Sequence, residues 1–216
     1  MVTRITLVRH GETAWNADGR WQGHAHVPLN PAGRRQAELL AEHLAESGTR
    51  FHCVVSSDSV RASETGATVA SKLGIPLELD PRLRELDIGE WQGLTADEVR
   101  RWDPQRYLEI EHDPYHRPRP GGESGAQSGA RAALCLEELA ARAGGTHCVA
   151  VSHGGTIRNL LQHLGLGRAD RVVVGNTSLS VFVHEVGADG LPRWSLEAFN
   201  EMPHLGGVAA RIEVEP

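Results

Sequence analysis

The chain has 216 residues, of which 40% are hydrophobic and 23% are charged, and these values are ordinary for a soluble α/β domain with a full core. Its formal net charge of −6 argues against nucleic acid or an anionic membrane surface as the main partner. The N-terminal apolar run is short and is interrupted by Thr3, Arg4 and Thr6, so it predicts neither a signal peptide nor a membrane span.

Strand and helix patterns alternate through the first part of the chain. Apolar runs of strand length lie at residues 2–8 and 51–56, and each is expected to form a buried strand. Between them, Ala37, Leu40 and Leu44 follow the helical repeat. The patterns predict, in chain order, a strand over residues 2–8, a helix from Pro31 to about Ser47, a strand over 51–56, a helix from about Val60 to Leu73 that Gly74 and Pro76 end, and a short strand over 77–79.

Residues from about 95 to 123 differ in composition from the segments on either side. They are rich in Pro, His, Arg and Tyr and predict short helical pieces at most. We interpret them as an insertion that lies over the sheet edge as a lid, and a solvent-exposed irregular segment is the alternative. The basic and aromatic side chains of the insertion include Arg100, Arg101, Tyr107, Tyr115, His116, Arg117 and Arg119.

The remainder of the chain returns to regular patterns. These predict a long helix over residues 124–142, a buried strand over 147–152, a helix over about 155–164, and two β-rich segments over about 178–186 and 193–199, joined by a turn at Asp189-Gly190. Because strands alternate with helices, we expect an α/β fold, a three-layer α-β-α sandwich whose mainly parallel, mixed sheet is covered on both faces. No repeat or linker divides the chain, and a single domain over residues 1–216 is the simplest account.

The three cysteines, Cys53, Cys135 and Cys148, are odd in number and lack the spacing of a metal site. Cys53 and Cys148 lie in apolar, strand-like runs, which favours small buried hydrophobic side chains. Free cysteines of this kind are typical of a reducing cytoplasm.

Polar residues follow the first two predicted strands. Arg9 and His10 end the run Leu7-Val8-Arg9-His10, and Arg61 lies in Ser56-Ser57-Asp58-Ser59-Val60-Arg61-Ala62. Ligands of α/β proteins bind at the carboxyl ends of the strands. A neutral His10 could act as a nucleophile there, and the guanidinium groups match the geometry of phosphoryl oxygens. A structural histidine and a solvated arginine are the alternatives.

His153 lies in Val151-Ser152-His153-Gly154-Gly155, between a predicted strand and a predicted helix. As an imidazolium it could stabilise negative charge in a transition state. Backbone N–H groups of Gly154 and of the helix start could add to the anion site, and glycine allows the backbone to approach a phosphate closely. A helix-capping histidine is the alternative, but it does not explain the glycine pair.

These motifs, together with Leu83-Arg84-Glu85, resemble those of the histidine phosphatase superfamily, also called the phosphoglycerate mutase-like family. They occur in the order of the family, and the resemblance runs from Thr3 to about Leu205. It implies a phosphoglycerate mutase-like fold, a phosphorylated intermediate on His10, and a metal-independent reaction without a cofactor. It also implies that His153 stabilises the transition state.

Composition alone does not select the general acid, because Glu12, Asp87 and Glu90 compete with Glu85. The resemblance selects Glu85 as the group that protonates the leaving oxygen and later activates water. It also implies contacts to phosphate or substrate from Asn16, Gln22 and Gly23. For these three, ordinary turn chemistry is the alternative reading.

The family contains phosphatases and mutases. The short span from Glu85 to His153 and the motif Pro120-Gly121-Gly122-Glu123-Ser124 resemble the phosphatase branch. We therefore expect hydrolysis of a small phosphorylated metabolite, with specificity set by the insertion. A phosphoglycerate mutase that needs 2,3-bisphosphoglycerate, a non-catalytic phosphate-binding scaffold and a metallohydrolase are the alternatives. A homodimer is a further expectation, since dimers are frequent in the family.

Overall fold

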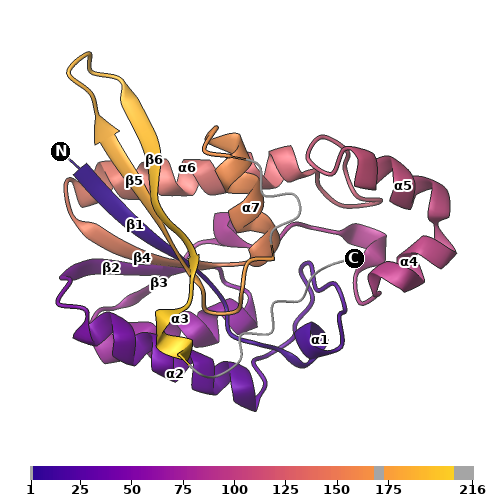
Figure 1. Ribbon diagram of the computed structural model, residues 1–216, viewed down its shortest axis with the longest axis horizontal. Helices are drawn as coiled ribbons and strands as arrows, with labels where there is room; N and C mark the ends of the chain where they lie inside the picture. The colour runs from indigo at the N-terminus through magenta and orange to yellow at the C-terminus, as the bar shows by residue number, and fades with distance from the viewer. Residues whose placement is uncertain (1, 168–172, 207–216) are drawn as a thin grey trace.

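A six-stranded sheet crosses the centre of the protein in the order β3-β2-β4-β1-β5-β6. It is seen in a computed structural model that describes residues 2–167 and 173–206 (Figure 1). The strands are β1 (Val2–Arg9), β2 (Phe51–Ser56), β3 (Leu77–Leu79), β4 (His147–Ser152), β5 (Leu179–Val186) and β6 (Pro192–Glu201). β1 to β4 run parallel, whereas β5 pairs antiparallel with both β1 and β6. The predicted mixed, mainly parallel sheet is confirmed.

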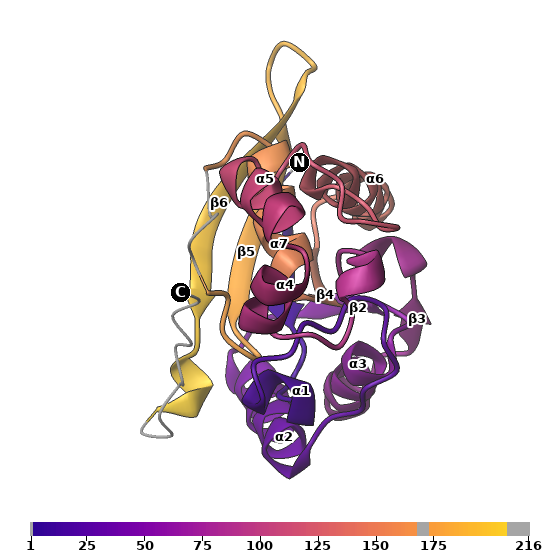
Figure 2. The same cartoon turned by 90° about the vertical axis from the view of Figure 1, so that its right-hand side faces the viewer.

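Helices cover both faces of this sheet. They are α1 (Ala14–Ala17), α2 (Pro31–Glu46), α3 (Val60–Leu73), α4 (Ala96–Trp102), α5 (Pro104–His112), α6 (Gly125–Ala143) and α7 (Gly154–His163), with short 3₁₀ turns η1 (Pro81–Leu83), η2 (Gly89–Trp91) and η3 (Pro203–Leu205). Helices α2 and α3 lie on one face and α6 and α7 on the other (Figure 2). The three-layer α-β-α architecture expected from the sequence is therefore confirmed.

Each face of the sheet has its own hydrophobic core, because successive side chains of a strand point to opposite faces. On β1, Leu7 packs with Leu136 and Ile157 of α6 and α7, whereas Val8 packs with Leu40 of α2. All five side chains are at most 1% exposed. Burial of such a side chain contributes roughly 1.5–3 kcal/mol to folding, so that each strand is fixed from both sides.

The ends of the helices agree closely with the predictions. Asn30 caps α2 through its side chain, which accepts a hydrogen bond from Gly33 N at 2.7 Å, and Pro31 fills the first turn. Gly74 ends α3 in the left-handed region, at φ 68°, where glycine is favoured. These capping residues explain why the boundaries of α2 and α3 could be predicted to within about a residue.

The two cysteines in the sheet are bonded to each other, and the prediction that they are free was wrong. Cys53 of β2 and Cys148 of β4 are partners in the parallel register, with Cα atoms 5.0 Å apart and a disulfide between them. Their separation of 95 residues concealed this proximity, which only the pairing of β2 with β4 creates. Cys135 is free and buried. The disulfide removes the reason for expecting a reducing cytoplasm.

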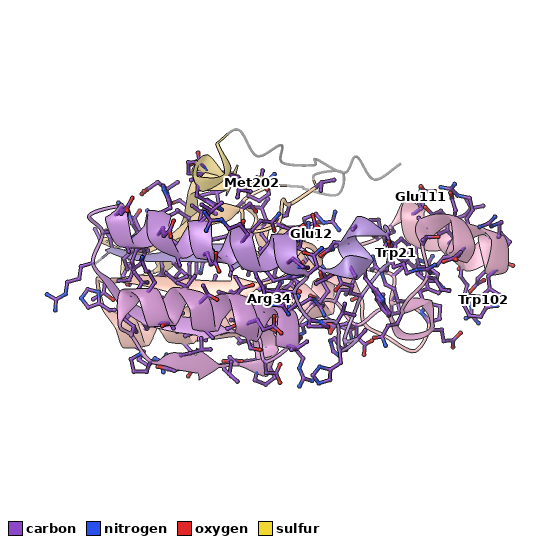
Figure 3. The ribbon with its side chains drawn as sticks, turned by 90° about the horizontal axis from the view of Figure 1, so that it is seen from below. Glu12, Trp21, Arg34, Trp102, Glu111 and Met202 are labelled. Carbon is purple, nitrogen blue, oxygen red and sulfur yellow. A yellow bond between two sulfur atoms is a disulfide. The ribbon has the colours of Figure 1, made fainter. Side chains whose placement is uncertain are left out.

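The insertion forms the two short helices α4 and α5, which extend beyond the sheet edge at the right of Figure 1. They have a small hydrophobic cluster of their own, formed by Trp91, Val99, Tyr107 and Ile110. In Figure 3 Trp102 lies at the outer end of this part, and Trp21 lies between it and the sheet. The prediction of short helical pieces is confirmed.

Among the residues that the structure describes, no helix is both long enough and apolar enough to cross a membrane.

Candidate active site

The carboxyl ends of β1, β2 and β4 meet at one edge of the sheet. Arg9 of β1 pairs with Ser152 of β4, and Ser56 of β2 pairs with Val151 of the same strand. The residues that follow these strands are consequently neighbours, although they lie far apart in the chain. This register brings His10, Arg61 and His153 together.

His10 is 2% exposed and is fixed by two hydrogen bonds. Its Nδ1 lies 2.7 Å from the carbonyl oxygen of Gly11. Since a carbonyl only accepts, Nδ1 carries the proton. Its Nε2 is then an acceptor, and it accepts from Nε of Arg61 at 3.3 Å. The ring thereby presents an unprotonated nitrogen to the site, in the tautomer that a nucleophile requires.

The pKa of His10 lies well below its ordinary value of 6.5, first because the ring is buried and then because Arg61 and Arg9 are close. Burial and neighbouring cations both disfavour imidazolium. The side chain is therefore neutral at physiological pH, and its Nε2 carries a lone pair that accepts from Arg61.

Arg61 begins α3 and is fully buried. Its Nη2 donates to the carbonyl of Gly23 at 2.8 Å, and its Nη1 donates to the carbonyl of Ala25 at 3.0 Å. Burial lowers its pKa to about 10, whereas the charge of Glu85 acts in the opposite direction. The guanidinium thus stays charged at neutral pH and points at His10. Arg9 also reaches this edge, where its Nη1 donates to the carbonyl of Val174.

His153 precedes the first turn of α7 and is fully buried. Its Nε2 lies 2.9 Å from the hydroxyl of Ser57, and its ring centroid is 5.1 Å from that of His10. Within the described residues, its Nδ1 is buried without a hydrogen-bond partner. Burial, Arg61 and His10 hold its pKa well below 6.5. The ring is therefore neutral here, and the predicted imidazolium would need the negative charge of a phosphoryl group to form.

Glu85 lies against the N-terminus of α7. Its Oε1 accepts hydrogen bonds from the backbone of Leu86 at 2.8 Å and of Thr156 at 3.0 Å, and its Oε2 accepts from Gly155 N at 3.2 Å. A Cβ atom on Gly155 would lie 2.7 Å from Oε1. The glycine pair therefore has two roles, since Gly154 faces Arg9 and Gly155 makes room for Glu85.

The three rival carboxylates are placed differently. Glu12 accepts a hydrogen bond from Asn30, the carboxylate of Asp87 is 3.9 Å from His24, and Glu90 is more than half exposed. Of these four carboxylates in the described part of the chain, Glu85 is the one whose charge raises the pKa of Arg61. The geometry therefore favours Glu85.

Asn16, Gln22 and Gly23 lie in the loop region between β1 and α2. Asn16 closes a capping box with Thr13 and accepts a hydrogen bond from Asn176 at 3.4 Å. Gln22 is 8% exposed, and its Oε1 lacks a partner among the described residues. Gly23, at φ 48°, presents its carbonyl to Arg61. Turn chemistry thus accounts for part of the role of each residue.

Four residues that support the site carry little signal in the sequence. Asn176 donates to the carbonyl of His10 at 3.0 Å, and the backbone of Thr177 donates to the carbonyl of Arg9 at 3.0 Å. The other two are Ser57, which is hydrogen-bonded to His153, and Arg131, which donates to the carbonyl of Glu85. Only Ser57, directly after a predicted strand, lay in a segment that the motifs had marked.

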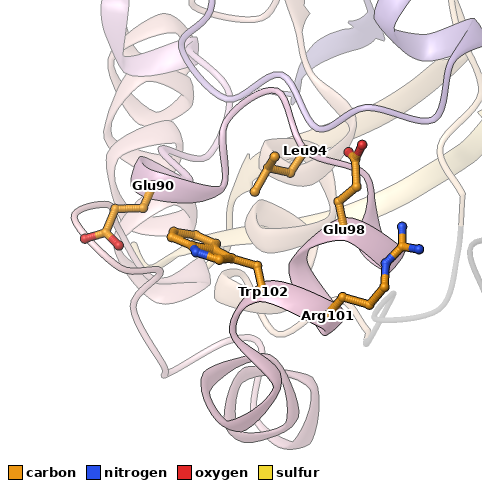
Figure 4. A pocket seen from close by; sticks show the side chains of 5 residues that line it. All are labelled: Glu90, Leu94, Glu98, Arg101 and Trp102. Atoms are coloured by element: carbon orange, nitrogen blue, oxygen red, sulfur yellow. The ribbon is translucent and has the colours of Figure 1, made fainter.

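An open hollow of about 570 Å³ lies apart from these residues, beside the insertion. Its lining consists of Glu90, Leu94, Glu98, Arg101 and Trp102, and in Figure 4 the indole of Trp102 extends between the side chains of Glu90 and Leu94. None of the predicted site residues lines it. In the part of the chain that the structure describes, no group of three or more His, Cys, Asp or Glu side chains is placed to hold a metal ion.

Two histidines, two arginines and a carboxylate at the carboxyl edge of an α/β sheet define a class of phosphoryl-transfer sites. The sequence profile of the histidine phosphatase superfamily (branch 1) matches residues 5–197. The chain belongs to this superfamily, and the resemblance seen in its motifs is confirmed.

Individual relatives span nearly the whole chain. A phosphoglycerate mutase-like protein 4 of Arabidopsis thaliana is 36% identical over 93% of this chain and 86% of its own length. A metal-independent phosphoserine phosphatase of the same plant is 34% identical over 96% of this chain and 85% of its own. Among solved structures, a mycobacterial glucosyl-3-phosphoglycerate phosphatase in complex with VO3 superposes with a TM-score of 0.80, at 31% identity over 91% of this chain and 98% of that one.

Proposed function

We propose that the protein hydrolyses phosphomonoesters of small metabolites through a phosphohistidine on His10, without a metal. The observation that supports this most is the buried, neutral His10, whose protonated Nδ1 is tied to Gly11 and whose Nε2 faces Arg61. A phosphate-binding scaffold would need the arginines but not a histidine in this tautomer.

In the first step Nε2 of His10 attacks phosphorus, and the bond from phosphorus to the leaving oxygen breaks. Arg9 and Arg61 neutralise the phosphoryl oxygens, and Glu85 in its protonated form gives its proton to the leaving alkoxide. His153 offers its buried Nδ1 to a phosphoryl oxygen. When that ring gains a proton, it adds positive charge where negative charge develops.

In the second step water attacks the phosphorus of phosphohistidine, and the bond between nitrogen and phosphorus breaks. Glu85, now a carboxylate, accepts the proton of the water, inorganic phosphate leaves, and His10 returns to its neutral form. His10 and Glu85 thus serve in both steps. Glu85 gives up a proton in the first step and accepts one in the second.

Replacement of the nucleophile tests the proposal. His10→Ala should reduce the hydrolysis of p-nitrophenyl phosphate to background, while the wild type should stay active in EDTA. Substantial activity in the His10→Ala variant would refute the nucleophile, and loss of wild-type activity in EDTA would point to a metallohydrolase.

The substrate is proposed to be a small, polar phosphorylated metabolite. Relatives are named for phosphoserine and for glucosyl-3-phosphoglycerate, both of which carry a carboxylate besides the phosphate. The basic side chains of the insertion suit such anions. The net charge of −6 supports a small-molecule partner rather than nucleic acid or a membrane.

The name of the phosphoglycerate mutase-like relative keeps a second candidate activity in view. A mutase would return the phosphoryl group of His10 to a bound phosphoglycerate instead of to water. NMR of 3-phosphoglycerate with and without 2,3-bisphosphoglycerate separates the two reactions. We expect inorganic phosphate from the hydrolase, whereas 2-phosphoglycerate that forms only with the bisphosphate would establish the mutase.

A further inference from the structure

Arg131 of α6 reaches away from its helix to the segment that carries Glu85. Its Nη1 donates to the carbonyls of Arg82 and Arg84, both at 2.7 Å, and its Nη2 donates to the carbonyl of Glu85 at 2.9 Å. Three carbonyls within four residues of chain are thus held by one guanidinium. An arginine can do this because its donors lie in one rigid plane.

Glu123 holds this guanidinium in place. Nε of Arg131 donates to both carboxylate oxygens of Glu123 at 3.1 Å, and its Nη2 donates to Oε1 at 3.0 Å. The two side chains are 22% and 18% exposed, respectively. The pair is more shielded from solvent than the pair that Arg142, also on α6, forms with Glu78, in which both side chains are about half exposed.

Glu123 also belongs to the base of the insertion. Its backbone N–H donates to the carbonyl of Asp87 at 2.9 Å, and its carbonyl accepts from the backbone of Arg119. A Cβ atom on the neighbouring Gly122 would lie 2.3 Å from the carbonyl oxygen of Asp87. The segment just after Glu85, at Asp87, is therefore packed against the segment of Gly122 and Glu123, and Glu123 also holds Arg131.

From this arrangement we infer that Arg131, oriented by Glu123, is the positioning residue for the general acid Glu85. The inference rests on the role proposed above for Glu85. The carboxylate of Glu85 reaches the backbone N–H groups of α7 only if the Glu85 backbone is correctly placed. Arg131 holds that backbone against α6. Misplacement of a reacting group by about 1 Å can lower a rate by about 100-fold.

The dependence on the leaving group tests the inference. A general acid matters most for a poor leaving group such as an alkoxide and least for p-nitrophenolate, which leaves without a proton. Arg131→Lys keeps the charge but cannot bridge three carbonyls. The constant to compare is kcat/KM, because it reports the steps up to phosphorylation of His10, whereas kcat also includes the attack by water that Glu85 assists. We expect Arg131→Lys to lower kcat/KM for β-glycerophosphate by about 10- to 100-fold and kcat/KM for p-nitrophenyl phosphate by a few-fold at most.

Two further variants make the comparison decisive. Glu85→Gln provides the reference profile, and Arg142→Lys, on the same helix but outside the site, should leave both substrates unaffected. If Glu85→Gln lowers kcat/KM equally for both substrates, the acid assignment is wrong. If Glu85→Gln discriminates between the substrates and Arg131→Lys does not, only the positioning role is refuted.

Folding is monitored by the melting temperature of each variant. If Arg131→Lys does not fold, Glu123→Gln decides, because it keeps the size of the side chain and removes only the charge that orients Arg131. It should discriminate between the two substrates in the same direction. An equal effect on both would overturn the inference.

Discussion

At the scale of single residues, the hydrogen bond between Arg61 and His10 links the state of the nucleophile to the binding of phosphate. Nε of Arg61 donates to the nitrogen that would attack, so the lone pair of His10 is occupied until another acceptor competes for Arg61. A phosphoryl oxygen is a stronger, charged acceptor. Substrate binding would therefore free the nucleophile and clamp the phosphate through the same guanidinium.

The lowered pKa of His10 gives a prediction for the pH dependence of activity. Because burial, Arg61 and Arg9 all lower this pKa below 6.5, the neutral ring should persist well into the acid range. The acid limb of kcat/KM that belongs to His10 should then lie well below pH 6.5. NMR titration of labelled imidazole should show the same shift, and Arg9→Gln should move it back toward the ordinary value. Titration of His10 at its ordinary pKa would contradict the electrostatic account.

The same shift affects stability. In the unfolded chain His10 takes up a proton near pH 6.5, whereas the folded protein resists it, so unfolding is favoured by acid. The free energy of unfolding should fall by up to about 1.4 kcal/mol per pH unit for such a histidine below pH 6.5. This contribution should be absent in His10→Ala. An identical pH dependence of melting in the two proteins would count against a lowered pKa.

At the scale of elements, the insertion places its basic residues unequally. Arg119 is half-buried, donates to the carbonyl of Pro114 at 2.6 Å, and has its pKa lowered to about 10 by burial and by Arg158, against the influence of Glu85. Arg117 is exposed. The insertion thus brings one of its arginines within electrostatic reach of Glu85, the proposed general acid.

A pair of variants tests whether this arginine helps to select the substrate. Arg119→Ala should raise KM for phosphorylated metabolites that bear a carboxylate by about 10-fold, the loss expected for a charged contact, with p-nitrophenyl phosphate unaffected. Arg117→Ala is the matched control and should behave as the wild type. Equal substrate profiles for the two variants would show that Arg119 does not contribute to specificity.

The elements that could be predicted are those in which one local pattern dominates. Helix α2 has a cap at Asn30, a proline in its first turn and an apolar stripe that agree with one another, and β3 was marked by its neighbours Gly74 and Pro76. The insertion lacked such agreement, because its core residues Trp91, Val99 and Tyr107 lie on separate short elements. Their proximity depends on tertiary packing that no local pattern contains.

In the site, too, residues marked by a local pattern could be predicted, whereas residues brought in by tertiary packing could not. His10 and His153 directly follow predicted strands, and Arg61 lies at the start of the helix that follows another. A mainly parallel sheet was enough to expect the three together, and the register of β1, β2 and β4 brings them to one edge. Asn176 and Arg131 were missed, since one follows residues that carry no motif and the other lies on the side of a regular helix.

At the scale of the whole molecule, the Cys53–Cys148 disulfide joins two neighbouring strands of the central sheet. A cross-link that closes a loop of about 95 residues constrains the unfolded chain and can contribute up to about 4 kcal/mol to stability. Reduction should therefore lower the melting temperature without changing the fold, because both side chains remain packed in the sheet.

Thermal unfolding with and without dithiothreitol measures this contribution. Reductant should destabilise the wild type and Cys135→Ser alike, and it should have no effect on a Cys53→Ala/Cys148→Ala variant. Under denaturing, non-reducing conditions, thiol titration should find only Cys135 free. Detection of all three thiols, with melting unchanged by reductant, would contradict the disulfide.

The most direct test of the central claim is to trap the phosphoryl group on the protein. Rapid quenching of the wild type with ³²P-labelled substrate should give a phosphoprotein that is stable in base and labile in acid, with the label on His10. The label should be absent from His10→Ala and should build up when Glu85→Gln slows attack by water. An acid-stable adduct, or label that persists in His10→Ala, would contradict the phosphohistidine mechanism.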